Sequence, residues 1–145
     1  MIVYAAIVDG PLTQQALSIA KHAAFQELAA TGNIGAYVNF EGIVRLQEPR
    51  PDSGGELQRL CALDYETYDP MAQRRLESLA QEISAKFSLH SILVLHSRGS
   101  VKVGEISFIL EIGAAHRAEA IEALTEFIDR MKQDVPIWKK PVWAS

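Results

Sequence analysis

The order of strand-like and helical runs constrains this fold more than any other feature. Strand-like segments occur in adjacent pairs between amphipathic helical segments, giving the order β-α-β-β-α-β-β-α followed by a tail. Adjacent strands with short connections favour antiparallel pairing over a fully parallel, doubly wound sheet. A chain of 145 residues is long enough for one domain with its own core. The sequence therefore predicts a single α+β domain over residues 1–145, with an antiparallel or mixed sheet and three main helices.

Hydrophobic periodicity places the individual elements along the chain. Segments with strand character are residues 2–8, 35–45, 57–68, 91–96 and 105–114. Helical spacing of apolar residues covers residues 12–30, a segment that follows Asp69-Pro70, and about 117–132. Asp69 suits the N-cap of its helix and Pro70 suits the first turn, whereas Pro136 forbids continuation of the last helix. We expect Ile121 among the buried residues of that last helix.

Two connections and the tail are expected to be irregular or extended. Residues 46–56, LQEPRPDSGGE, are rich in Pro, Gly, Ser and charge, which predicts an exposed, mobile loop. Arg98-Gly99-Ser100 is expected as a turn between two strands. Pro136 makes the segment 134–145 an extended tail in which successive side chains point to opposite sides.

Composition excludes several classes of function. A formal net charge of −4 leaves no face-wide excess of Lys and Arg for nucleic acid, and no window holds the run of apolar residues that a membrane span needs. Cys61 is the only cysteine, so an intrachain disulfide cannot form, and this fits a reducing cytosol. We expect Cys61 to be a buried thiol on the apolar face of its strand. We also expect the protein to be cytoplasmic. The histidines lack metal-ligand spacing, and we expect neither a metal nor a cofactor.

Basic residues are the candidates for chemistry, and each also has an ordinary explanation. Arg45 ends a strand before the predicted loop, where either a functional or a solvated arginine is common. Arg117 begins a helix, where it opposes the helix dipole and suggests an anion nearby, whereas Lys132 in the last turn complements the dipole. Lys139 and Lys140 should point to opposite sides, so one of them at most faces a pocket with Lys132. These patterns alone leave the role of the tail open.

Three separated blocks together resemble a known family. They are GAYVNFEGIVR (35–45), LDYETYDPMA (63–72) and VGEISFILEIGAAHRAEAIEALTEFIDRMKQDVPIWKK (103–140). In order and spacing they are similar to the large, catalytic subunit of molybdopterin synthase. The resemblance implies an α/β-hammerhead fold of the α+β class and a homodimer that binds a small ubiquitin-like subunit at each end, forming a heterotetramer.

The resemblance also implies a reaction and a set of site residues. The small subunit's C-terminal Gly-Gly thiocarboxylate would donate sulfur to cyclic pyranopterin monophosphate, forming the dithiolene of molybdopterin, so no catalytic cysteine is needed. Lys132 and Lys139 match the family's two active-site lysines. Arg45, His116 and Arg117 match residues that bind the anionic substrate. Tail residues 134–145 would close the pocket.

Two other hypotheses remain open. The chain departs from the family's H-R-x-G pattern, since it has His96-Ser97-Arg98-Gly99, and it ends at Ser145 without the longer tail of many members. These departures are compatible with a catalytically silent dimeric scaffold that binds the small sulfur-carrier subunit. Retention of Arg45, Lys132 and Lys139 argues for the enzyme. An unrelated dimeric α+β domain would require the match of three blocks to be accidental.

Overall fold

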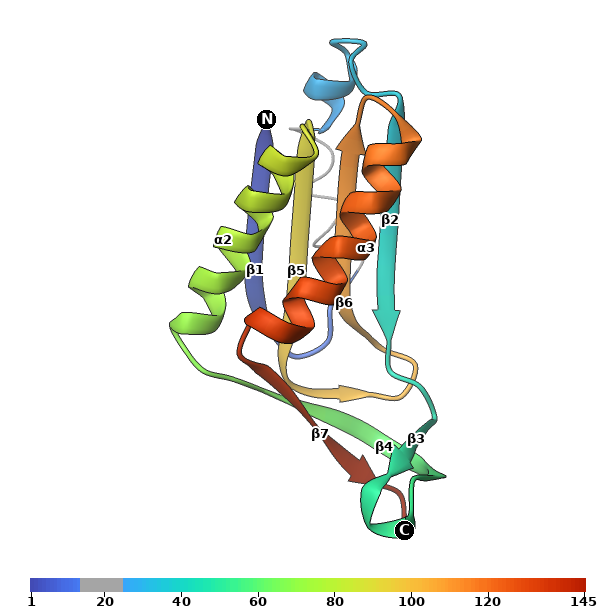
Figure 1. The fold of residues 1–145 in the computed structure, drawn as a ribbon. Coiled ribbons are helices and arrows are strands. Elements are labelled where there is room, and N and C mark those ends of the chain that lie inside the picture. Colours follow the sequence, from blue (N-terminus) through green and yellow to red (C-terminus); the bar gives the residue numbers. More distant parts are fainter. Residues whose placement is uncertain (14–24) are drawn as a thin grey trace.

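The fold is a mixed sheet with two long helices on one face and a smaller arm of strands below it (Figure 1). The computed structural model describes residues 1–13 and 25–145. The elements in chain order are β1 (Ile2–Asp9), β2 (Ala36–Ile43), β3 (Gln47–Arg50), η1 (Pro51–Ser53), β4 (Glu56–Thr67), α2 (Met71–Lys86), β5 (Ser91–Lys102), β6 (Ile106–Ala114), α3 (Arg117–Asp134) and β7 (Ile137–Trp143). Residues 25–29 form a helical segment before β2.

The helix expected over residues 12–30 lies largely outside the described residues, which omit 14–24. Its expected first residue, Leu12, has another role: it forms an isolated antiparallel bridge to Ile106 and is buried. Within the described part of the chain, no helix has the combination of length and apolar character that a membrane crossing requires.

Strand pairing confirms the predicted α+β class. The sheet has the order β2-β6-β5-β4-β3, with β1 beside β5 and β7 beside β4. β1 pairs with β5 in parallel, and the other strand pairs of the described chain are antiparallel. β4 therefore joins the main sheet, through β5, to the arm formed with β3 and β7.

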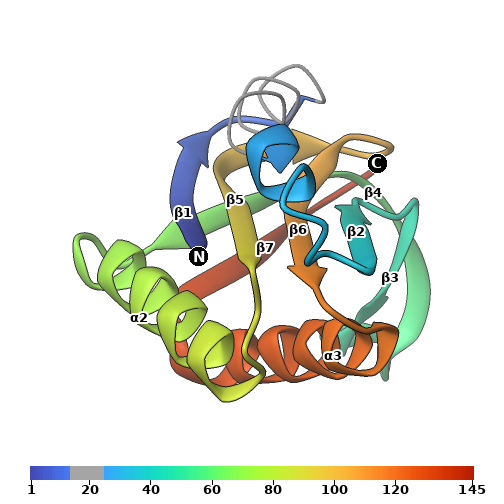
Figure 2. The same cartoon turned by 90° about the horizontal axis from the view of Figure 1, so that it is seen from above.

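The main hydrophobic core lies between the sheet and the helices α2 and α3, which run side by side along one face (Figure 2). A second cluster, formed by Leu12, Leu93, Leu95 and Ile109, covers the other face of β5 and β6. β6 is consequently buried from Ser107 to Ala114 on both faces. Burial of apolar surface on this scale is the dominant favourable contribution to folding.

The buried face of α3 is centred on small residues. Ala120, Ala123, Phe127 and Met131 are buried, whereas Ile121 is 53% exposed. The expectation of a buried Ile121 was therefore wrong, because the two alanines turn toward the sheet and allow the helix to approach it closely. The helix ends at Asp134, immediately before the segment containing Pro136, as the sequence predicts.

Residues 46–56 form regular structure, which corrects the prediction of an irregular loop. β3 pairs with the start of β4, and η1 connects the two strands. Arg50 Nε donates to Asp52 Oδ1 at 2.8 Å, and Arg50 Nη1 donates to Gln58 Oε1 at 3.2 Å. The Pro and Gly residues that suggested a loop instead build the tight connection of a hairpin.

The apolar side of β4 also differs from the prediction. Leu60 and Ala62 are buried, whereas Cys61 is exposed and Leu57 is 63% exposed. The pairing of β4 with β7 has a register irregularity between Leu60 and Ala62. Such a bulge changes which residues face the core, so the alternation read from the sequence fails on one side of it.

Arg98 lies within a continuous strand, since β5 runs from Ser91 to Lys102, and the expected turn at residues 98–100 was wrong. Its guanidinium bridges two carboxylates: Nε is 2.7 Å from Asp9 Oδ1 and Nη1 is 2.6 Å from Asp69 Oδ2. Asp69 is therefore not the N-cap of α2, a position that Pro70 occupies. The actual turn follows Lys102 and includes Gly104 at φ 87°.

Candidate functional site

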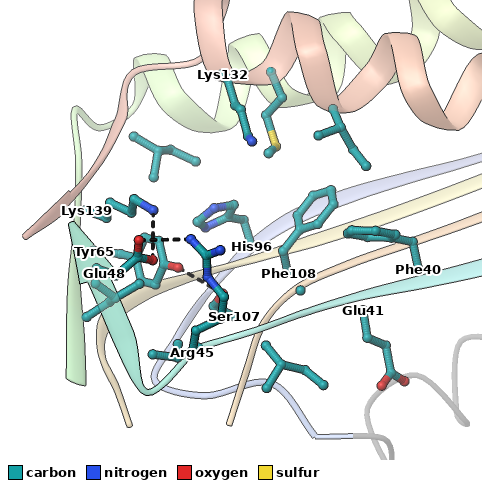
Figure 3. Close-up of a pocket in the computed structure, with 17 residues that line it drawn as sticks. Phe40, Glu41, Arg45, Glu48, Tyr65, His96, Ser107, Phe108, Lys132 and Lys139 are labelled. Carbon is teal, nitrogen blue, oxygen red and sulfur yellow. Dashed lines mark hydrogen bonds and ion pairs between the residues drawn. The ribbon is translucent and has the colours of Figure 1, made fainter. Parts of the chain in front are cut away.

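A pocket of about 600 Å³ opens where the main sheet meets the arm. Its walls come from the end of β2, the link to β3, the last turns of α3, and strands β4, β5, β6 and β7 (Figure 3). Phe40, Phe108 and Met131 provide an apolar wall, whereas Arg45, Lys132 and Lys139 provide positive charge. The cavity thus combines apolar surface with a few convergent charged groups, as small-molecule sites commonly do.

The two lysines expected at the site converge on this pocket from neighbouring elements. Lys132 extends from the last turn of α3, and Lys139 lies on β7, so the corner at Val135 and Pro136 separates them (Figure 3). Lys139 stands opposite Tyr65 in the β4–β7 pair, and both residues line the cavity. Lys140 points to the other side of the strand, where its Nζ is 2.7 Å from Glu66 Oε1. The predicted opposition of Lys139 and Lys140 is confirmed.

Glu48 is a pocket residue that the sequence did not reveal. Its carboxylate lies between two cations: Oε2 is 2.9 Å from Arg45 Nη2, and Oε1 is 3.4 Å from Lys139 Nζ. The only available signal was the alternation Gln47, Glu48, Pro49 in a segment whose composition indicated a loop. Recognising the hairpin would have placed Glu48 on one defined side of a strand.

Lys132 differs from the other two cations of the pocket. No hydrogen bond or ion pair links it to any residue in the described ranges, whereas Arg45 and Lys139 share Glu48. Its amine points into the cavity from above in Figure 3. A cation without a counter-ion at the cavity wall is available to an incoming anion or to a proton-transfer step.

The inner wall of the pocket holds a hydrogen-bonded tyrosine and a buried histidine. Tyr65 Oη donates to Ser107 Oγ at 3.0 Å, and burial raises the pKa of the Tyr65 phenol. His96 is 6% exposed and packs edge-on against the Tyr65 ring, with 5.0 Å between centroids. Burial lowers the pKa of His96, which favours the neutral ring.

The tautomer of His96 follows from one contact. Nδ1 lies 2.7 Å from the carbonyl oxygen of Ser97, an atom that can only accept a hydrogen bond. Nδ1 therefore carries the proton, and Nε2 carries the lone pair in the neutral ring. Such a ring can accept a hydrogen bond from a ligand at Nε2.

His116 and Arg117 are not brought to this pocket within the chain. They lie at the N-terminal end of α3, where both are exposed and His116 Nδ1 is 3.2 Å from Glu119 Oε1. Lys132 lies near the opposite end of the same helix, and a rise of 1.5 Å per residue separates it from Arg117 by about 22 Å. One chain cannot place these residues around one small ligand.

No group of three or more potential metal ligands occurs among the described residues.

Comparison with known proteins identifies the family of the chain. A family model described as MoaE protein matches residues 12–134. The molybdopterin synthase catalytic subunit of Oryza sativa subsp. indica is 41% identical over 109 residues, which are 75% of this chain and 53% of that protein. The chain thus spans about half the length of this curated relative.

Solved structures with the same fold include two at more than 25% identity. Molybdopterin synthase from Staphylococcus aureus gives a TM-score of 0.74 at 27% identity, covering 96% of this chain and 90% of the other. The complex of subunits 1 and 2 of the molybdopterin-converting factor from Helicobacter pylori 26695 contains a chain with a TM-score of 0.70 at 26% identity, with coverages of 97% and 90%. From the family match over most of its length, the chain belongs to the MoaE protein family.

Proposed function

We propose that the chain is the catalytic subunit of a molybdopterin synthase, a sulfurtransferase that acts on cyclic pyranopterin monophosphate. The observation that carries the proposal is the convergence of Lys132, Lys139 and Arg45 on one cavity that also has an aromatic wall. Those cations suit an anionic substrate, and Phe40 and Phe108 suit a flat ring. The sulfur donor in this proposal is the C-terminal thiocarboxylate of a small ubiquitin-like subunit. The complex of subunits 1 and 2 of the molybdopterin-converting factor from Helicobacter pylori supports a partner subunit.

The transfer balances without an oxidant or reductant. The thiocarboxylate sulfur forms a C–S bond to the pterin as a C–O bond breaks, which gives a thioester between the two molecules. The departing oxygen takes a proton, for which the donor is Lys132, a residue at the cavity wall without an ion pair in the described ranges. Water then cleaves the thioester, leaving a carboxylate on the partner and sulfur on the pterin, and a second donor repeats the sequence.

The charged side chains have separate tasks in this scheme. Lys132 transfers protons, whereas Lys139 and Arg45 stabilise the negative charge that develops on oxygen and sulfur. The Arg45 guanidinium can engage two oxygens of the substrate phosphate at once. The partner's extended glycine tail enters between the arm and α3, where its terminal group meets the cations.

His116 and Arg117 retain a substrate-binding role in the proposal only if a second copy supplies them. The homodimer implied by the family resemblance would do so, because each α3 would then contribute its N-terminal end to the neighbouring pocket. A mixing experiment tests this arrangement. Equal amounts of Lys132→Ala and Arg117→Ala chains, each inactive alone, should regain about a quarter of wild-type activity, since half the dimers would hold one intact pocket. No recovery contradicts the shared site.

The function itself is tested by reconstitution. The chain is incubated with a thiocarboxylated small subunit and cyclic pyranopterin monophosphate, and the dithiolene product is assayed. The wild-type chain should form product, and Lys132→Ala should not. Tight binding of the small subunit without product would instead identify the chain as a silent scaffold.

A further inference from the structure

Glu48 is an acidic side chain at the centre of a cationic pocket. Its side chain is only 11% exposed, whereas the side chains of its partners Arg45 and Lys139 are 71% and 54% exposed. Both carboxylate oxygens are engaged, one by each cation. The negative charge of Glu48 is therefore the least exposed of the three, although the proposed site is otherwise cationic.

Glu48 has a shorter and less exposed side chain than either cation, and a paired strand holds its backbone. Glu48 lies on β3 and pairs with Gln58 on β4. Arg45 lies in the link between β2 and β3 and has a long side chain that is mostly in solvent. Lys139 likewise reaches the carboxylate from β7 across the pocket mouth. When a ligand arrives, the flexible cations can turn toward it while the carboxylate stays in place.

An anion that binds Arg45 and Lys139 therefore meets two opposing effects of Glu48. The carboxylate holds the cations near the cavity, but it already occupies their donors and repels a second anion a few ångströms away. Gln at the same position would keep the shape and one acceptor oxygen while removing the charge. At about 5 Å and an effective dielectric constant of about 20, this repulsion is larger than the conformational-entropy cost of ordering one cationic side chain that Glu48 no longer holds. Removal of the charge should therefore strengthen anion binding.

We propose that Glu48 is an internal competitor for the anion subsite formed by Arg45 and Lys139, and that it sets how weakly this pocket holds anions. Glu48 is thus a specificity-determining residue: an anionic ligand must exchange with its carboxylate. Lys132, which makes no ion pair in the described chain, can contact the ligand without such an exchange. The inference rests on the proposed function in taking the pocket as a site for an anionic substrate.

Titration with inorganic phosphate at low ionic strength and pH 7 tests the inference, with binding followed by backbone amide NMR shifts. Glu48→Gln should bind phosphate about tenfold more tightly than wild type. Glu48→Asp, which retains the charge, should stay near the wild-type affinity. Glu66→Gln is the matched control, because Glu66 pairs with the neighbouring Lys140 outside the pocket. Phosphate affinity of this variant should change less than about twofold, since Glu66 occupies neither of the subsite's cations and does not line the pocket.

Several results would overturn the inference: unchanged or weaker phosphate binding by Glu48→Gln, an equal gain in Glu66→Gln, or no phosphate binding by any variant. If Glu48→Gln does not fold, the wild-type protein still provides a test. The carboxylate ¹³C resonance of Glu48 should shift on saturation with phosphate, and an unchanged resonance contradicts the exchange.

The outcome is separable from that of the proposed function. Tighter phosphate binding by Glu48→Gln, without dithiolene product from the wild-type chain, would support the exchange and reject the sulfurtransferase. Product formation by the wild-type chain, with unchanged phosphate affinity in Glu48→Gln, would support the sulfurtransferase and reject the exchange.

Discussion

Lys139 lies directly opposite Tyr65 in the antiparallel β4–β7 pair, and the two side chains line the same cavity. Lys140, one residue later, is opposite Asp64 and forms its ion pair with Glu66. Neighbouring lysines on one strand are thus assigned to different sides by the strand geometry alone.

This opposition predicts different effects of two similar substitutions on activity. Lys139→Ala should reduce dithiolene formation by about 100-fold or more, because under the proposed function it removes a charge that stabilises the transferring group. Lys140→Ala should leave the rate within about threefold of wild type, since it loses only an exposed ion pair. Reconstituted turnover with saturating small subunit measures both. Equal losses would contradict the placement of the active side chain.

Two apolar residues of α3 should contribute very differently to stability. Phe127 is fully buried, whereas Ile121 is 53% exposed. Phe127→Ala should lower the free energy of unfolding by about 3–5 kcal/mol, because it leaves a cavity in the main core. Ile121→Ala should change it by less than about 1 kcal/mol. Urea denaturation followed by circular dichroism compares them, and a large effect at Ile121 would mean that another surface covers it.

The buried ring of His96 should make stability depend on pH. Burial lowers the pKa of His96 in the folded protein. The His96 ring of the unfolded chain therefore takes up a proton near pH 6.5, whereas the ring in the folded protein is still neutral at that pH. Stability should therefore fall as the pH drops below about 6.5 and level off below the folded pKa. Thermal unfolding of His96→Gln should show a shallower decline over this range. A parallel decline would mean that His96 does not titrate differently in the two states.

Arg98 should stabilise the fold only while its carboxylate partners are ionised. The hydrogen bond and charge of Arg98 lower the pKa of Asp9, and hydrogen bonds from Thr67 and then Arg98 lower that of Asp69. Depressed carboxyl pKa values give stability that is present above about pH 3.9 and is lost as the pH falls through the folded values. Arg98→Met should thus lower the Tm at pH 7.

The difference in Tm between Arg98→Met and wild type should shrink as the pH falls below about 4. Arg75→Met is a suitable control, because Arg75 is an exposed arginine on α2 without an ion pair in the described residues. A difference that persists at pH 2 would indicate that packing of the Arg98 side chain, rather than its charge, stabilises the fold.

Features that depend on local geometry were predictable from the sequence. Alternating and helical spacing of apolar residues located the strand pairs, and Pro136 marked the end of α3 because its ring cannot continue a helix. The separation of Lys139 from Lys140 followed from the two-residue period of a strand. Family resemblance then selected Lys139 as the residue facing the cavity.

Features that depend on register or on distant partners were not predictable. The bulge beside Cys61 moves that thiol to the surface, and nothing in the local pattern marks it. Glu48 belongs to the pocket only because its hairpin folds against β7. His116 and Arg117 matched a family motif, but the motif does not reveal that they lie at the end of α3 opposite to Lys132.

The final strand, β7, forms part of the cavity wall and contributes Lys139 to it. β7 contacts β4 across a separation of about 70–80 residues, and pairings so distant along the chain tend to form slowly. Before β7 pairs with β4, α3 can position Lys132, but the part of the pocket that β7 lines is missing. Ligand-dependent protection against proteolysis would therefore distinguish molecules in which β7 has paired with β4 from compact ones in which it has not.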